Sequence, residues 1–227
     1  METNRTWSAH LAMPRLALLY VSLIAAGCQN LTDRFIAQLQ DGDPQVRRAA
    51  ARALGETPAD ASAAAAALSG ALADSDLEVR ELAAGSLGKL GTEAKPNVPA
   101  LEKALADSEP SVRLTAALAI QKIDPQARSY VPVLVEALRA GDGTVFLDVG
   151  RMGAGAMWAV PTLTALLADP RPKIRALAAH ALGEIGAQAS DAKAALQQRL
   201  RDPEASVRKA ARAALQQIGP AGATDGA

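Results

Sequence analysis

The chain of 227 residues contains one cysteine and two histidines. A single cysteine cannot form an intramolecular disulfide or a cysteine zinc cluster. With so few histidines, any metal site would have to be built almost wholly from carboxylates, so neither a metal site nor a cofactor is predicted. Aromatic residues make up only 3% of the chain, and 24 basic residues balance 24 acidic ones. Zero net charge argues against a nucleic-acid-binding protein, because such proteins usually carry a basic surplus.

The sequence also lacks the short motifs of common enzyme sites. It contains no G-x-S-x-G, no glycine-rich phosphate loop and no H-E-x-x-H, which are patterns of serine hydrolases, phosphate-binding proteins and zinc peptidases. His180 is predicted to lie at an exposed position of a helix, as a solvated side chain rather than a general base. No catalytic residue is predicted, and the expected function is non-enzymatic.

What the sequence has in excess is alanine, with 53 residues, and much of the chain is a repeat. Three series of apolar residues recur at intervals of 33, with one interval of 29. The series are Leu54, Leu87, Ile120, Val149, Leu182 and Leu215; Leu39, Leu72, Leu105, Leu138, Leu167 and Leu200; and Phe35, Leu68, Leu101, Leu134, Leu163 and Leu196. A fixed period of this length indicates a stack of supersecondary units that share one apolar core.

Each unit is predicted to contain two helices. Apolar residues four apart, such as Leu101 and Leu105, lie on one face of the first helix. Val-Pro pairs open three of these first helices and place proline where its missing N–H costs nothing. Turns rich in Asp and Pro connect them to second helices of the form VRxxAAxxLGxI, whose alanine pairs allow close packing. Glycines then follow at helix ends, at Gly91, Gly186 and Gly219.

This pattern resembles the HEAT family of α-solenoids, in particular its short bacterial type named after phycobilisome lyases. The resemblance covers about residues 31–219 and implies an all-α, right-handed α-solenoid of six two-helix repeats. In that family a turn aspartate and an arginine of the second helix form a ladder between neighbouring repeats. The matching residues are Asp41/Arg47, Asp74/Arg80, Asp107/Arg113, Asp169/Arg175 and Asp202/Arg208. The resemblance gives these residues a structural role.

The fourth repeat, at about residues 131–153, departs from the pattern. The interval from Ile120 to Val149 is 29 residues, and the ladder aspartate and arginine are both absent. Three glycines further weaken helix formation there. A shortened second helix and a local change in curvature are predicted. Two interpretations stay open, namely decay of one repeat in a scaffold and a bend that shapes a binding groove.

The N-terminus resembles a bacterial lipoprotein signal. Residues 16–27 read LALLYVSLIAAG, without a charge, and lead from Arg15 to the only cysteine, Cys28. This run is shorter than the roughly 20 residues of a transmembrane helix and fits the apolar part of a secretory signal. The predicted segments are a signal peptide at 1–27, with Met1 or Met13 as the start, a lipidated N-terminus at 28–30, the repeats at 31–219 and a flexible tail at 220–227. The alternative is a cytoplasmic repeat protein with a misassigned start.

If Cys28 is lipidated, the chain is expected at the bacterial cell envelope. Gln29, where an aspartate would favour the inner membrane, resembles the outer-membrane sorting pattern of hosts with two membranes. The membrane is then contacted through the lipid alone.

The predicted function is a protein-binding scaffold or adaptor, because solenoids bind partners along the concave face that the second helices line in this family. Around the Leu-Gly pair, three stripes of second-helix positions are basic or apolar in the middle repeats. The candidate partner-binding residues are Lys89, Leu114, Leu118, Lys122, Phe146, Leu147, Arg151, Trp158 and His180. The expected partner is a protein or peptide, without nucleic acid, and the chain is expected to be a monomer. The alternative is an enzyme or enzyme subunit of the HEAT-like lyase or hydroxylase type.

Overall fold

The computed structural model describes residues 31–56 and 60–219. The predicted signal peptide, Cys28 and the tail at 220–227 lie outside these residues. The described part of the chain is helical, without a β-strand. It forms six helix pairs, of which the first joins residues 31–38 to α2. The predicted fold class, an all-α α-solenoid of two-helix repeats, is confirmed.

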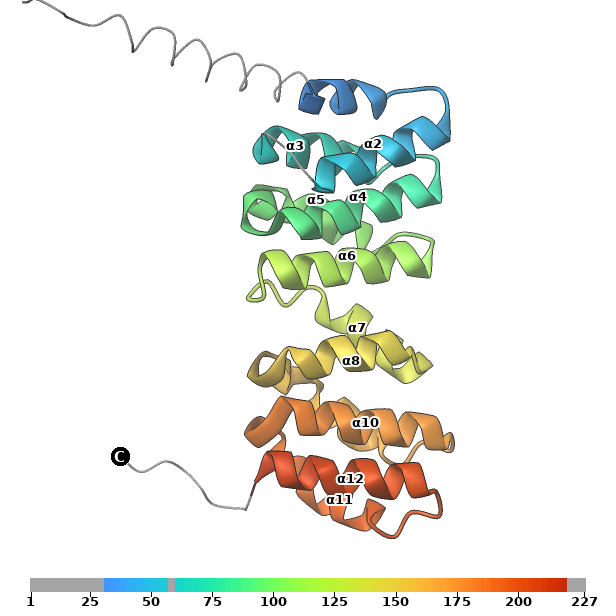
Figure 1. The fold of residues 1–227 in the computed structure, drawn as a ribbon, viewed down its shortest axis with the longest axis vertical. Helices are drawn as coiled ribbons and strands as arrows, with labels where there is room; N and C mark the ends of the chain where they lie inside the picture. The colour runs from blue at the N-terminus through green and yellow to red at the C-terminus, as the bar shows by residue number, and fades with distance from the viewer. Residues whose placement is uncertain (1–30, 57–59, 220–227) are drawn as a thin grey trace, which may run out of the picture. The chain divides into compact units, whose positions relative to one another are not determined.

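The chain divides into two compact units between Leu101 and Glu102, within helix α5 (Val98–Ala104). The first unit contains residues 31–38 and the elements α2 (Pro44–Glu56), α3 (Ala61–Ala71), α4 (Leu77–Leu90) and η1 (Gly91–Asn97). In this unit α2 packs on α4, and α3 packs on both (Figure 1).

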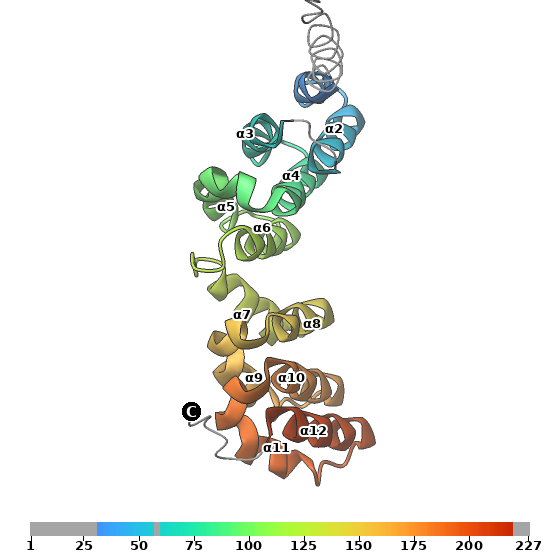
Figure 2. The same ribbon diagram turned by 60° about the vertical axis from the view of Figure 1, so that its left-hand side comes forward.

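The second unit contains the later repeats. Its elements are α6 (Pro110–Ile123), α7 (Val131–Ala140), α8 (Gly143–Arg151), η2 (Gly153–Ala159), α9 (Val160–Leu166), α10 (Pro172–Ile185), η3 (Gly186–Ala192), α11 (Lys193–Arg199) and α12 (Ala205–Ile218). Helix α10 packs between α8 and α12, and α7, α9 and α11 form the other layer (Figures 1 and 2). The second helices α8, α10 and α12 therefore form one continuous layer in which neighbouring helices run side by side.

Local sequence explains where the helices begin and end. The Asp76 carboxylate accepts a hydrogen bond from the Val79 backbone N–H at 3.0 Å and so caps α4. Proline occupies the first turn of α6, α7, α9 and α10. Gly91, Gly186 and Gly219 follow α4, α10 and α12 with φ of 60°, 75° and 78°. A side chain is strained at these angles, so glycine is the residue that ends these helices.

Most residues of the three apolar series lie in the core. Leu68, Leu87, Leu101, Leu134 and Leu182 are all fully buried. The alanine pairs of the second helices are buried beside them, at Ala83/Ala84, Ala116/Ala117 and Ala178/Ala179. With alanine at these positions, neighbouring helices approach closely and the core stays thin.

Two glycines of the Leu-Gly pairs lie where the second helices of successive repeats approach closely. A Cβ on Gly183 of α10 would come within 2.9 Å of the Ala214 Cα of α12. A Cβ on Gly55 of α2 would come within 2.8 Å of the Ser86 Cα of α4. Carbon atoms do not approach this closely without a shift of backbone, so these glycines set the spacing between second helices of successive repeats.

Candidate functional site

Ladder residues join neighbouring repeats at two places, one in each unit. The Arg47 side chain donates two hydrogen bonds to the Asp74 carboxylate, at 2.8 and 2.9 Å. The Arg175 side chain donates two to the Asp202 carboxylate in the same way, at 2.9 and 2.8 Å. In each pair the aspartate lies 27 residues after the arginine. We call such a two-bond contact a rung. Arg175 and Asp202 are buried, with 8% and 4% of their surface exposed.

Within one repeat the arginine contacts the backbone rather than the carboxylate of the aspartate six residues earlier. The Nη1 atom of each ladder arginine donates to that aspartate's carbonyl oxygen at 2.8–2.9 Å; the five arginines are Arg47, Arg80, Arg113, Arg175 and Arg208. Each arginine therefore orders its own turn with one edge. The rungs at Arg47 and Arg175 show that the other edge can hold the next repeat.

The fourth repeat interrupts this arrangement. Helix α8 has nine residues, whereas α6, α10 and α12 have 14 each. Asp142 caps α8 by accepting hydrogen bonds from the Thr144 N–H and hydroxyl at 2.9 and 2.6 Å. Arg171 of the following turn bonds Asp169 and also donates to the carbonyl oxygens of Arg139 and Ala140 at 3.3 and 3.2 Å. Repeat five is thus tied to repeat four through backbone oxygens.

Arginine contacts lower the pKa of several turn aspartates. Hydrogen bonds from Arg48 lower the pKa of Asp76 from 3.8 to about 2, and those from Arg171 lower the pKa of Asp169 to about 2 as well. The Asp202 pKa is also lowered, chiefly by Arg175. These carboxylates stay ionised in the folded chain at a pH where they are protonated in the unfolded chain.

We expect stability to fall as the pH drops below about 4, the pKa of an unperturbed aspartate, towards the Asp76 pKa of about 2. The folded-state pKa is the lower one, so protons bind the unfolded chain preferentially and the stabilisation is present only above this window. Asp76→Asn is expected to be less stable than the parent at neutral pH, with a gap that closes as the pH falls. Urea midpoints followed by circular dichroism measure this, and Arg48→Gln should behave alike. If the urea midpoints of the parent and the variants differed by the same amount at every pH, the stabilising role of the Asp76 charge would be contradicted.

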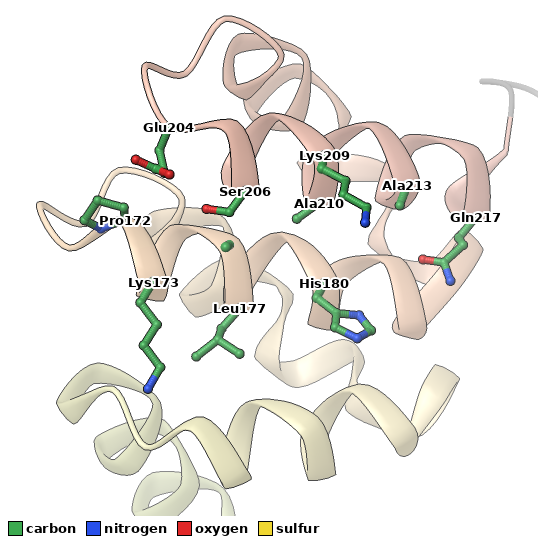
Figure 3. Close-up of a pocket in the computed structure, with 11 residues that line it drawn as sticks. Pro172, Lys173, Leu177, His180, Glu204, Ser206, Lys209, Ala210, Ala213 and Gln217 are labelled. Carbon is green, nitrogen blue, oxygen red and sulfur yellow. The ribbon is translucent and has the colours of Figure 1, made fainter.

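A groove with a volume of about 720 Å³ lies between α10 and α12, within the second unit (Figure 3). Its apolar lining comes from Leu177 and from three alanines, Ala176, Ala210 and Ala213. Lys173 of α10 and Lys209 of α12 also line it, and neither has an ion-pair partner among residues 31–56 and 60–219. Glu204 lies at the start of α12 and Gln217 near its end. We call this the α10–α12 groove.

A second, smaller hollow of about 200 Å³ lies between α8 and α10. Leu177 and His180 line both this hollow and the α10–α12 groove, so the two are adjacent. Leu147 and Arg151 of α8 form its other side, and 41% of Leu147 is exposed. The His180 Nδ1 lies 3.9 Å from the Glu184 carboxylate on the same helix face. Three predicted binding residues, Leu147, Arg151 and His180, therefore meet at one place.

Phe146 also lines the hollow between α8 and α10, and its predicted contact with a partner stays a prediction. Only 1% of its surface is exposed, because it lies one position before Leu147 on the buried side of the short helix α8. Trp158 is half-buried in η2, with its ring against Tyr130 at a centroid distance of 6.2 Å. Its indole N–H is buried and has no hydrogen-bond acceptor among the described residues. The Trp158 side chain therefore packs largely against its own chain.

The remaining candidates lie away from the α10–α12 groove. Leu114 and Leu118 are half-buried on α6, and Lys122 is exposed in its last turn. Lys89 is exposed on α4 of the first unit, with its amino group 3.6 Å from the Glu56 carboxylate. These residues remain predicted binding residues that no contact in the structure tests.

Sequence analysis missed the groove residues Lys173, Leu177 and Ala210. Three other groove residues lie at the same second-helix positions that supplied candidates in the middle repeats, namely Ala176, Lys209 and Ala213. The signal was present in repeats five and six, as two lysines around small apolar residues. These positions do not predict a binding surface, because alanine in a helix predicts close packing rather than an open surface.

The described helices include none long and apolar enough to cross a membrane. Among residues 31–56 and 60–219 no group of three or more His, Cys, Asp or Glu side chains is placed to hold a metal ion.

Comparison with protein families agrees with the repeat structure. The family described as HEAT repeats matches residues 32–98 and 150–225, and the HEAT repeat matches residues 98–127. The chain belongs to the HEAT-repeat family. No curated protein matches this HEAT-repeat chain.

Several solved structures are similar to it. The complex of CpcE and CpcF of phycocyanin lyase from Nostoc sp. PCC7120 contains a chain with 26% identity and a TM-score of 0.54, over 83% of this chain and 77% of that one. An engineered protein has 24% identity and a TM-score of 0.53, over 82% and 96% of the two chains. A computationally designed armadillo repeat protein for modular peptide recognition has 21% identity and a TM-score of 0.50, over 82% and 98%. The last two similarities show the fold alone, and this fold supports a protein-interaction scaffold in general.

Proposed function

We propose that this HEAT-repeat protein is a non-catalytic adaptor at the bacterial envelope, anchored through lipidated Cys28, which binds a protein partner along α8, α10 and α12. The observation that carries the proposal is the α10–α12 groove of about 720 Å³ and its continuation beside α8. A pocket of this size is large enough for several side chains of a bound polypeptide.

The chemistry of the surface supports a polypeptide as the ligand. Leu177 and the groove alanines offer apolar area, which is the main source of binding energy at protein interfaces. Lys173 and Lys209 are exposed and make no ion pair within the described residues, so they are available to carboxylates of a partner. Rigid stacked helices lose little conformational entropy when a partner binds.

Site-specific photo-crosslinking in the native host tests the binding surface. A photoreactive residue at Ala213, exposed in the groove, is expected to give one dominant adduct with an envelope protein. The same residue at Gln198, exposed on α11 of the other layer, is the matched control and is expected to give none. Equal adducts from both positions would contradict the site, and exclusively cytoplasmic adducts would contradict the location.

A charge reversal gives a second test of the same surface. Lys209→Glu is expected to weaken partner capture by at least about tenfold, because a lost attraction is replaced by repulsion. Lys193→Glu on α11 makes the same change of charge outside the groove and is expected to leave capture unchanged. Equal capture by parent and Lys209→Glu, with unchanged helical circular dichroism, would exclude the groove.

A subunit of an enzyme complex is a second candidate, favoured by the similarity to the phycocyanin lyase chains at 26% identity. That structure is a complex of two proteins, CpcE and CpcF. By analogy, this chain would co-purify with a second repeat protein and form a stable complex with it. Mass spectrometry of the captured material distinguishes the candidates, since the adaptor predicts a partner that is not such a subunit.

A further inference from the structure

The fourth repeat leaves one rung of the ladder incomplete. In complete rungs the arginine uses Nη1 for its own turn and the edge formed by Nε and Nη2 for an aspartate 27 residues later. Arg113 follows the first half of this rule, since its Nη1 donates to the carbonyl oxygens of Asp107 and Ser108 at 2.9 and 3.1 Å. The residue 27 positions later is Ala140, which has no carboxylate.

The second edge of Arg113 is therefore available. Within residues 31–56 and 60–219 it makes no hydrogen bond through Nε or Nη2. Its nearest carboxylate oxygen is Oε1 of Glu136, 3.8 Å from Nη2, and 70% of the Glu136 side chain is exposed. An exposed pair at this distance contributes little. The Arg113 side chain is only 23% exposed, its Nη1 is fixed by the two backbone carbonyls, and it lines a hollow beside α7.

The space that the missing carboxylate would fill is open. A hollow of about 350 Å³ lies between α6 and α7, and Arg113 and Ala140 both line it. Leu114, Val133 and Ala137 provide apolar walls. We call this the fourth-repeat hollow. Its volume exceeds that of a single carboxylate and leaves room for a neighbouring apolar side chain.

The other side of the fourth repeat has no such vacancy. There Arg171 binds Asp169 with two hydrogen bonds of 2.9 Å and reaches the carbonyl oxygens at the end of α7. The loss of the ladder arginine is thus compensated by a different arginine. The loss of the ladder aspartate beside Arg113 is not compensated.

We propose that the fourth-repeat hollow binds an acidic side chain of a partner polypeptide, whose carboxylate contacts Nε and Nη2 of Arg113 in place of the missing aspartate. An apolar residue beside the acidic one packs on Leu114 and Val133. Bidentate contacts between arginine and carboxylate combine strength with a fixed geometry, and the rungs at Arg47 and Arg175 show that this edge forms them. The site goes beyond the α10–α12 groove and shares no residue with it.

Two acidic residues also line the hollow, and they differ in their effect. Asp142 is engaged by Thr144 at the start of α8 and is compensated there. Glu136 competes with the incoming carboxylate for Arg113 and repels it. Removal of the Glu136 charge is therefore expected to strengthen binding, a result that a general basic patch would not predict.

The test uses the full chain and a fluorescent library of short peptides, acetylated and amidated, with a fixed central Asp flanked by Leu or Val. A second library carries Asn at the centre. The parent protein is expected to bind the Asp library at least about tenfold more tightly than the Asn library. Glu136→Gln should tighten binding about threefold, and Arg113→Lys, which keeps the charge but loses the planar edge, should weaken it.

Ala140→Asp is the variant that separates binding from folding. Its carboxylate is expected to complete the rung, raise the urea midpoint and abolish binding of the Asp library. Equal binding of the two libraries, absence of binding to either, or unchanged binding by Ala140→Asp would overturn the proposal. A third library repeats the Asn peptides with a free C-terminal carboxylate in place of the amide, and its preferential binding would overturn the acidic side chain as the ligand. None of these results affects crosslinking at Ala213, so the two sites are tested separately.

Discussion

Asp202→Ala is expected to lower the free energy of unfolding by about 2–4 kcal/mol. The carboxylate has 1% of its surface exposed and accepts two hydrogen bonds from Arg175, at 2.9 and 2.8 Å. Removing it leaves a guanidinium with 10% exposure and no carboxylate in this contact, and an uncompensated charge at a buried position is more costly than a missing pair. Urea unfolding of the parent and the variant measures the difference.

Asp41→Ala is the matched control, because Asp41 occupies the same turn position in the first repeat. Each of the two carboxylates accepts a hydrogen bond from the backbone N–H two residues later, Asp202 from Glu204 at 3.0 Å and Asp41 from Asp43 at 2.8 Å. Asp41 is exposed, and among the described residues its carboxylate accepts no hydrogen bond from an arginine; only its backbone carbonyl does, from Arg47. Its replacement is expected to cost about 1 kcal/mol or less. The difference between the variants therefore measures the arginine contacts of Asp202, which are the two hydrogen bonds from Arg175 and the weaker ion pair with Arg199 at 3.6 Å.

Asp202→Ala is expected to destabilise the helices next to the substitution more than the rest of the chain. In a repeat protein each unit is stabilised mainly by its neighbours, and Arg175 of α10 holds the turn that precedes α12. Hydrogen exchange in α12 should therefore accelerate more than in α8. Arg175→Met in the Asp202→Ala background should restore part of the stability, because the buried charge is then removed. Equal unfolding free energies for Asp41→Ala and Asp202→Ala would contradict a stabilising rung.

The repeat register could be predicted from sequence because each structural position carries the same kind of residue in almost every repeat. Leucines at 54, 87 and 182 recur where the core needs them, and all are buried. The partners of the turn residues were harder to predict. Spacing within one repeat associates Arg175 with Asp169, whereas the side-chain rung joins Arg175 to Asp202 of the next repeat. A sequence does not give the distances between repeats. It therefore cannot show that Arg175 contacts the backbone of Asp169 but the carboxylate of Asp202.

Exposed apolar surface beside basic residues was predicted in the middle repeats, and the structure also has a groove of this kind in repeats five and six. Hydrophobicity favoured the middle repeats, where Phe146 and Leu147 are adjacent, yet burial divides them at 1% and 41% exposure. The α10–α12 groove is lined by small residues. In a sequence, an alanine that lines a groove cannot be told apart from an alanine that packs in the core. Which alanines are covered depends on the angle and distance between α10 and α12, which glycine at 183 sets through its lack of a Cβ.

Gly183→Ala is therefore expected to destabilise the protein by about 1–3 kcal/mol, although alanine favours a helix over glycine by about 0.5–1 kcal/mol. The added methyl would lie 2.9 Å from the Ala214 Cα and 3.2 Å from its Cβ, and it would meet the Gln217 side chain. Backbone atoms cannot give way as a flexible side chain does, so α10 and α12 must move apart. Urea unfolding measures the loss.

Gly70→Ala is the control with the opposite expected sign. Gly70 lies in α3, is exposed, and a Cβ there would have no neighbour within 4 Å. The same substitution should stabilise the chain by about 0.4–1 kcal/mol, because it restricts the unfolded state without a clash. If Gly183→Ala also stabilises the protein, helix propensity rather than close approach governs this position. A loss at 183 beside a gain at 70 shows instead that the Leu-Gly pair fixes the distance between α10 and α12, and through it the width of the α10–α12 groove.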